Sequence, residues 1–157
     1  MRSFTSPPAL GVAQAEMQVL RRQAIEPTTL LPYHRVGPRD WWVSDVDSPR
    51  YNTRQVCDRD ACPFDTNVSE QLGAIMPEYE YAVVIDYNTA ARIPGAGSTF
   101  FLHVSAGVPT QGCVALSRDD ILALMRWLDP TRMPVMAIGA NEVNALFITT
   151  KALALGR

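Results

Sequence analysis

The chain has no long apolar run. Residues 1–8 carry one positive side chain but lack the stretch of about 7–15 apolar residues that a secretory signal requires. No other stretch approaches the length of a membrane span. A positive charge excess is missing too, because the formal net charge of the 157 residues is −2 and the pI is near 5.6. We therefore expect no membrane span and no nucleic-acid partner.

Histidine and cysteine are scarce, which narrows the possible chemistry. The chain has two histidines and three cysteines. Cys57 and Cys62 bracket a short polar loop and could close a disulfide, which would leave Cys113 as the single free thiol. Two unpaired thiols, or half of a zinc site, are the alternatives. The zinc site is the weaker one, because no second cysteine pair is present and only His34 and His103 could complete it. We expect neither a metal nor a cofactor.

Cys113 and His103 are the candidate catalytic pair. A free cysteine has a pKa of about 8.5, so a nearby imidazole or a cluster of amide groups must help it to form the nucleophilic thiolate. Gly112 has no Cβ and allows a sharp turn, in which the amides of Gly112 and Cys113 could form an oxyanion hole. Thr110 could hydrogen-bond across this turn. The alternative is that Cys113 and His103 are buried structural residues.

The composition, 47% hydrophobic and 19% charged, is that of one domain with a single core. The firmest element is a helix over residues 121–128, because apolar residues recur at helical spacing after the capping residue Ser117. Strands are expected within residues 78–87, 99–104 and 135–138. Residues 8–23 have a helix-like pattern with a poorly defined apolar face.

Residues 27–63 are rich in turn formers and aromatic residues, which favours short strands and long loops. We assign Trp42 to the core and leave open whether Trp41 stacks on a sugar or lies in the core. The three acidic residues nearby could form a cation site or a pair of glycosidase carboxylates, but their loop setting favours turn capping. These residues are Asp40, Asp45 and Asp47.

Five segments, in order, resemble the catalytic domain of the L,D-transpeptidase family. The resemblance spans about residues 30–139, and its segments are residues 81–88, 93–98, 101–104, 109–116 and 127–130. The family's histidine and its Ser/Thr-x-Gly-Cys turn correspond to His103, Thr110, Gly112 and Cys113. The chain departs from the family in two ways: the separation between His103 and the turn is short, and Ala115 stands where many members carry arginine or asparagine.

The resemblance implies a mainly β fold with few helices. We expect a β-sandwich or mixed sheet with one well-defined helix after the cysteine turn. The expected organisation is an N-terminal segment over residues 1–29, poorly matched and helical in pattern, a catalytic domain over residues 30–139, and a C-terminal tail over residues 140–157. Because the family's domain begins with strands upstream of residue 31, we also consider an N-terminally truncated form that lacks one wall of the β-structure.

The resemblance also implies an activity. Cys113 would attack a carbonyl of a peptidoglycan stem peptide to form an acyl-enzyme thioester, while His103 transfers the proton and a backbone carbonyl of Val104 or Ser105 orients the imidazole. An acceptor amine would then give a cross-link, and water would give L,D-carboxypeptidase activity. Such enzymes work outside the cytoplasmic membrane. The alternatives are a catalytically inactive relative that binds cell-wall peptides, and a cysteine hydrolase of small amides.

Overall fold

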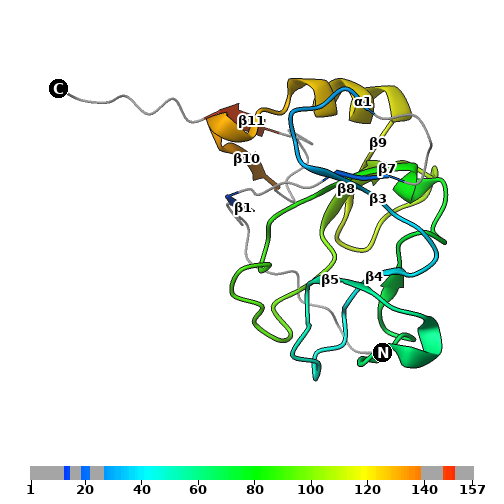
Figure 1. The fold of residues 1–157 in the computed structure, drawn as a ribbon. Coiled ribbons are helices and arrows are strands. Elements are labelled where there is room, and N and C mark those ends of the chain that lie inside the picture. The colour runs from blue at the N-terminus through cyan, green and yellow to red at the C-terminus, as the bar shows by residue number, and fades with distance from the viewer. Residues whose placement is uncertain (1–12, 15–18, 22–26, 139–146, 151–157) are drawn as a thin grey trace.

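The computed structural model describes residues 13–14, 19–21, 27–138 and 147–150. These residues form a mainly β fold with three small sheets and one α-helix, α1 (Arg118–Trp127), which confirms the predicted mainly β class. Figure 1 shows α1 on one side of the central sheet and strands β4 and β5 on the other side. Within the described part of the chain, no helix has the length and apolar character that crossing a membrane requires.

The central sheet has five strands. Its order is β3 (Tyr33–Arg35), β2 (Val19–Arg21), β7 (Tyr81–Val84), β8 (Phe101–Val104) and β9 (Val114–Leu116). Strands β7 and β8 pair antiparallel, and all of their residues are buried. Their β-branched and aromatic residues suit a strand that is covered on both faces, so the strands predicted within residues 78–87 and 99–104 are present, although shorter.

Two further sheets flank the central one. The first has the order β5 (Arg54–Val56), β4 (Asp40–Trp42), β6 (Glu70–Gln71), and the second has the order β1 (Ala13–Gln14), β10 (Pro134–Ala137), β11 (Phe147–Thr150). Strand β10 matches the strand predicted over residues 135–138. Three single turns of 3-10 helix complete the described elements: η1 (Arg59–Ala61), η2 (Glu78–Glu80) and η3 (Pro130–Arg132).

The alternation of side chains in β7 and β8 divides the core into two parts. Val83, Leu102 and Val104 point to the α1 side, where Ile121 and Met125 of the helix cover them. The intervening residues face the other way and pack against Trp42, Leu72 and Tyr79; they include Ala82, Val84 and Phe101. Because successive residues of a strand point to opposite faces, His103 belongs to this second face.

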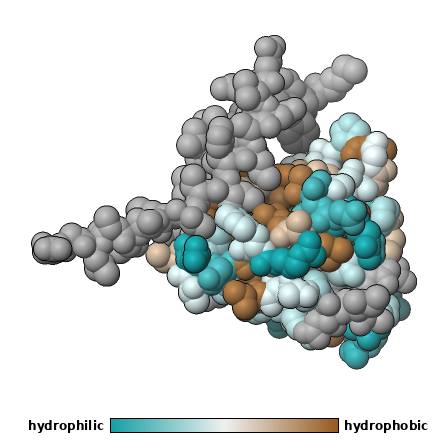
Figure 2. Space-filling view, turned by 90° about the horizontal axis from the view of Figure 1, so that it is seen from above, coloured by the Kyte–Doolittle hydropathy of each residue, from teal (hydrophilic) through white to brown (hydrophobic). Residues whose placement is uncertain are grey.

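Helix α1 confirms the firmest sequence prediction. Its first turn is capped by Ser117, whose hydroxyl oxygen accepts a hydrogen bond of 3.1 Å from the backbone N–H of Asp120. Ile121 and Met125, four residues apart, are fully buried. The helix ends at Trp127, before Pro130. Seen from the side that carries α1, the described surface is largely polar with apolar residues between (Figure 2).

Two of the three tryptophans, Trp41 and Trp42, lie in strand β4 of the small sheet. Trp42 is 5% exposed, as predicted for a core residue, and its indole N–H donates to the side-chain oxygen of Asn52 at 2.8 Å. Trp41 is 0% exposed and packs with Val43 and Phe64, so it offers no face on which a sugar could stack. Of the two interpretations of Trp41, sugar stacking and a place in the core, the structure supports the core.

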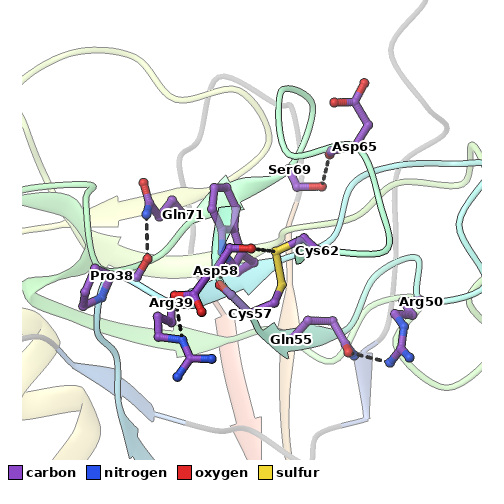
Figure 3. Close-up of a disulfide and its surroundings, with 11 residues drawn as sticks. Pro38, Arg39, Arg50, Gln55, Cys57, Asp58, Cys62, Asp65, Ser69 and Gln71 are labelled. Atoms are coloured by element: carbon purple, nitrogen blue, oxygen red, sulfur yellow. Dashed lines mark hydrogen bonds and ion pairs between the residues drawn. A yellow bond between two sulfur atoms is a disulfide. The ribbon is translucent and has the colours of Figure 1, made fainter. Parts of the chain in front are cut away.

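A disulfide joins Cys57 and Cys62 beside Trp41 (Figure 3). Asp58 follows Cys57 and forms an ion pair of 3.1 Å with Arg39, whose backbone carbonyl accepts from the Cys57 N–H. With both sulfurs used in this bond, neither can be a zinc ligand. No group of three or more His, Cys, Asp or Glu in the described part of the chain could hold a metal ion.

The acidic residues of this region cap turns and pair with cations. Asp40 accepts from the N–H of Gly37 at 2.8 Å and pairs with Arg54 at 2.6 Å and His34 at 3.0 Å. Asp45 accepts from the N–H groups of Asp47 and Asp65, at 3.1 and 3.0 Å. These contacts agree with turn capping and give no support to a pair of glycosidase carboxylates.

The helix predicted over residues 8–23 is wrong where the structure describes this segment. Ala13–Gln14 and Val19–Arg21 are strands, and β2 lies between β3 and β7 in the central sheet. Two sheet partners outweigh the weak helical pattern, because strand formation depends on packing and pairing more than on local preference. Strand β2 therefore supplies β-structure upstream of residue 31. The rest of residues 8–23, the turn predicted at Gly139 and most of the tail lie outside the described residues.

Candidate active site

The parallel pairing of β8 and β9 brings His103 and Cys113 to one face of the central sheet. Leu102 is paired with Val114 and His103 with Ala115. One residue back in this register, Cys113 lies opposite Phe101, so its side chain is on the face of His103. The two side chains are thus diagonal neighbours on one face of adjacent strands. The thiol and the imidazole do line one cavity.

His103 is oriented by the chain itself. Its Nδ1 lies 2.8 Å from the backbone carbonyl oxygen of Val104, one of the two residues predicted to supply this contact. A carbonyl oxygen only accepts hydrogen bonds, so the proton of the neutral imidazole is on Nδ1 and the lone pair is on Nε2. The ring is 5% exposed and meets the ring of Tyr79 edge-on, with 6.0 Å between centroids. Nε2 is therefore the atom that can take a proton.

Cys113 is a protonated thiol in this arrangement. Its S–H donates to the backbone carbonyl of Thr99 at 3.3 Å, and the residue is partly buried. Burial raises the pKa of the Cys113 thiol, a backbone hydrogen bond from Phe101 lowers it, and the negative charge of Glu70 raises it. The thiolate is thus disfavoured at rest, and a nucleophilic role requires a base that removes the proton during attack.

The turn before Cys113 requires glycine. Gly112 has a φ of +95°, and a Cβ at this position would lie 3.2 Å from the ring of Phe100. Thr110 donates its hydroxyl to the carbonyl oxygen of Cys113 at 2.5 Å, which ties the two ends of the turn together. Both residues shape the turn before Cys113. An oxyanion hole formed by the amides of Gly112 and Cys113 stays a prediction.

The cavity has a volume of about 360 Å³ and is lined by carboxylates as well as by the candidate pair. Its walls come from β6, η2, the end of β8 and the loop between β8 and β9. Its lining residues with ionisable or hydroxyl side chains include Glu70, Glu78, Tyr79, His103, Thr110 and Cys113. The disulfide lies apart from these residues in its own cluster with Trp41.

Glu70 and Tyr79 form a hydrogen-bonded pair in the cavity wall that sequence reasoning missed. The Tyr79 hydroxyl donates to Oε2 of Glu70. Burial raises the pKa of Glu70, against the lowering effects of the Tyr79 hydrogen bond and of a charged His103. Burial and the adjacent Glu70 charge raise the pKa of Tyr79, so the phenol stays neutral.

A second, larger cavity of about 520 Å³ lies between the small sheet and β7, with Trp42, Arg54 and Asp86 among its lining residues. None of the described residues that line it is histidine or cysteine, and its Arg54 is already paired with Asp40. The smaller cavity is therefore the candidate active site.

Comparison with protein-family models, with curated proteins and with solved structures finds no match to this chain.

Proposed function

We propose that the protein is a cysteine acyltransferase of the L,D-transpeptidase type that acts on peptidoglycan stem peptides outside the cytoplasmic membrane. One observation carries the proposal: Cys113 and His103 line the same cavity, and the Val104 carbonyl holds the imidazole in the tautomer that leaves Nε2 as a base. The Cys57–Cys62 disulfide is compatible with an oxidising compartment.

The raised pKa of Cys113 and its bond to Thr99 indicate that the thiol is neutral until the substrate binds. As sulfur attacks the peptide carbonyl, His103 Nε2 takes the thiol proton and then returns it to the departing amine, so that the peptide C–N bond breaks and a thioester forms. An acceptor amine, or water, next attacks the thioester carbonyl. His103 again transfers the proton, and the Cys113 thiol is restored.

A peptide-binding protein without catalytic activity is the second candidate. The same two features of Cys113 favour it, because a buried thiol with a raised pKa is less nucleophilic at neutral pH than a free cysteine. Under this reading the cavity would hold a stem peptide and leave its bonds intact. The two candidates differ in whether a covalent bond forms at Cys113.

Incubation of the protein with a stem tetrapeptide and an acceptor amine, followed by mass spectrometry, tests the proposal. We expect a thioester located at Cys113 and release of the terminal D-amino acid. Cys113→Ala and His103→Ala should abolish both, whereas His34→Ala should retain them, since His34 pairs with Asp40 outside the cavity. His34→Ala is a matched control because it removes the chain's other histidine.

Absence of both thioester and product in the folded wild-type protein would overturn the acyltransferase. Tetrapeptide binding without covalent change would then select the binding protein. Hydrolysis of small amides in preference to stem peptides would instead favour the cysteine hydrolase. Circular dichroism of each variant separates a loss of chemistry from a loss of fold.

A further inference from the structure

Glu78 has a buried carboxylate oxygen without a hydrogen-bond partner in the described part of the chain. Among the described residues, no group hydrogen-bonds to its Oε2, although this atom is removed from solvent. Leaving a buried acceptor unsatisfied is costly, and buried polar groups in native proteins are nearly always paired. Glu78 also lines the cavity that contains Cys113 and His103. A ligand that carries a hydrogen-bond donor into the cavity would satisfy this oxygen.

The charge of the cavity wall indicates which kind of donor fits. Glu70 and Glu78 are its two carboxylates, and none of the described residues that line it is Lys or Arg. Oε2 of Glu70 already accepts from Tyr79, whereas Oε2 of Glu78 has no donor within the described part of the chain. A wall of this kind attracts a cation and repels an anion.

Ala115 lies on the sheet beside the candidate pair, although it is not among the residues that line the cavity. Ala115 is paired directly with His103 and, by strand alternation, faces the same side of the sheet. A methyl group at this place cannot bind a ligand carboxylate, as the arginine or asparagine of many L,D-transpeptidases there could. Among the described residues, the cavity wall thus offers carboxylate acceptors for an ammonium group and contains no Lys or Arg for a carboxylate.

We propose that Glu78, assisted by the charge of Glu70, is a specificity-determining residue that binds a side-chain ammonium group of the peptide in this cavity. The three N–H donors of an ammonium group can satisfy Oε2 of Glu78 with a charge-assisted hydrogen bond. A side chain that carries a carboxylate beside its ammonium group fits less well, because the carboxylate meets the negative wall. The inference rests on the proposed function in taking the ligand to be a peptide that presents its carbonyl to Cys113.

Calorimetric titration with two peptides of matched shape tests the inference. The probes are Nα-acetyl-L-lysyl-D-alanine and the corresponding norleucyl peptide, which lacks the ammonium group. Cys113→Ala serves as the protein, so that no turnover disturbs the titration. We expect the lysyl peptide to bind at least about tenfold more tightly, because a charge-assisted hydrogen bond in a buried site has that effect.

Two variants in the same background locate the effect. Glu78→Gln keeps the shape of the side chain and removes its charge, so the tenfold preference should fall to about twofold or less. Asp60→Asn removes one negative charge from an exposed residue of η1 outside the cavity, and the preference should remain. The comparison of the two peptides on Cys113→Ala does not depend on a second variant. It therefore tests the inference even if Glu78→Gln fails to fold.

Equal affinities, no measurable binding of the lysyl peptide, or a preference that survives in folded Glu78→Gln would overturn the inference. Failure of the proposed function gives a different result. If the wild-type protein prefers the lysyl peptide but forms no thioester, the ammonium-binding subsite is supported and the acyltransferase activity is rejected. If it forms the thioester but shows no preference, only the subsite is rejected.

Discussion

The negative charge of Glu70 opposes ionisation of Cys113. Glu70 raises the pKa of the Cys113 thiol in addition to the larger effect of burial. Glu70→Gln removes this charge, so the thiol should lose its proton at a lower pH and a greater thiolate fraction should be present at neutral pH. The rate of alkylation of Cys113 by iodoacetamide, measured against pH, should therefore have its midpoint at a lower pH than in the wild type.

Asp60→Asn is the control for this measurement, because it removes an equal charge from an exposed site, and its midpoint should match that of the wild type. A midpoint for Glu70→Gln that stays in place or moves to higher pH would contradict the electrostatic role of Glu70.

The second prediction at the residue scale concerns the stability of the turn at Gly112. Its φ of +95° and the nearby Phe100 ring mean that Gly112→Ala introduces backbone strain together with a steric conflict. We expect a loss of about 1–3 kcal/mol in the free energy of unfolding, measured in urea, and slower thioester formation.

Gly95→Ala is the matched control for Gly112→Ala. Gly95 has a φ of +78°, and no atom of the described residues lies within 4 Å of the place that its Cβ would occupy. Gly95→Ala therefore introduces the backbone strain without the steric conflict. It should lower the free energy of unfolding by less than Gly112→Ala does. Equal losses of stability in the two variants would show that the Phe100 ring moves aside without a cost in free energy.

The candidate pair could be selected from sequence because a scarce thiol, a scarce imidazole and a glycine turn lie close together along the chain. Glu70, Glu78 and Tyr79 could not be selected in this way. They come from β6 and η2, well before His103 in sequence, and only the folding of these segments against the sheet brings them to the cavity. Their roles depend on burial and charge, which no local pattern encodes.

At the scale of elements, the cap of α1 is the clearest target. Ser117→Ala removes the acceptor for the Asp120 N–H and should lower the free energy of unfolding by about 1 kcal/mol. Urea unfolding followed by circular dichroism measures this loss. Ser117→Thr retains a hydroxyl that can accept from the Asp120 N–H and donate to the Asp120 carboxylate, so it should recover most of the stability. If both variants lose the same amount, the cap contributes little and packing of Ile121 and Met125 alone holds the helix.

The helix and strand β2 show why some elements were predicted and others were not. The signals for α1 are local: a capping serine, two acidic residues and apolar residues at helical spacing. Strand β2 has no such signal, since only three residues form it and its conformation is set by pairing with β3 and β7. Weak local preferences yield to sheet pairing, and the helix expected over residues 8–23 fails for that reason.

At the scale of the whole molecule, the buried carboxylate of Glu70 links folding to pH. Burial raises the pKa of Glu70 above its ordinary value of 4.5, so the native state binds this proton more tightly than the unfolded chain does. Stability from this proton is fully present below pH 4.5 and is lost as the pH rises through the higher native pKa. The group therefore favours the folded state in acid.

Glu70→Gln cannot titrate at this position, and the remaining groups titrate in both proteins. The difference in free energy of unfolding, wild type minus Glu70→Gln, should consequently decrease as the pH rises from 4.5 and then level off. Urea unfolding at a series of pH values measures this difference. A difference that increases with pH would mean that the Tyr79 hydrogen bond and the charge of His103, both of which lower the pKa of Glu70, outweigh its burial. Glu70 also opposes formation of the Cys113 thiolate. One carboxylate therefore affects both the pH dependence of the free energy of unfolding and the ionisation of the candidate nucleophile.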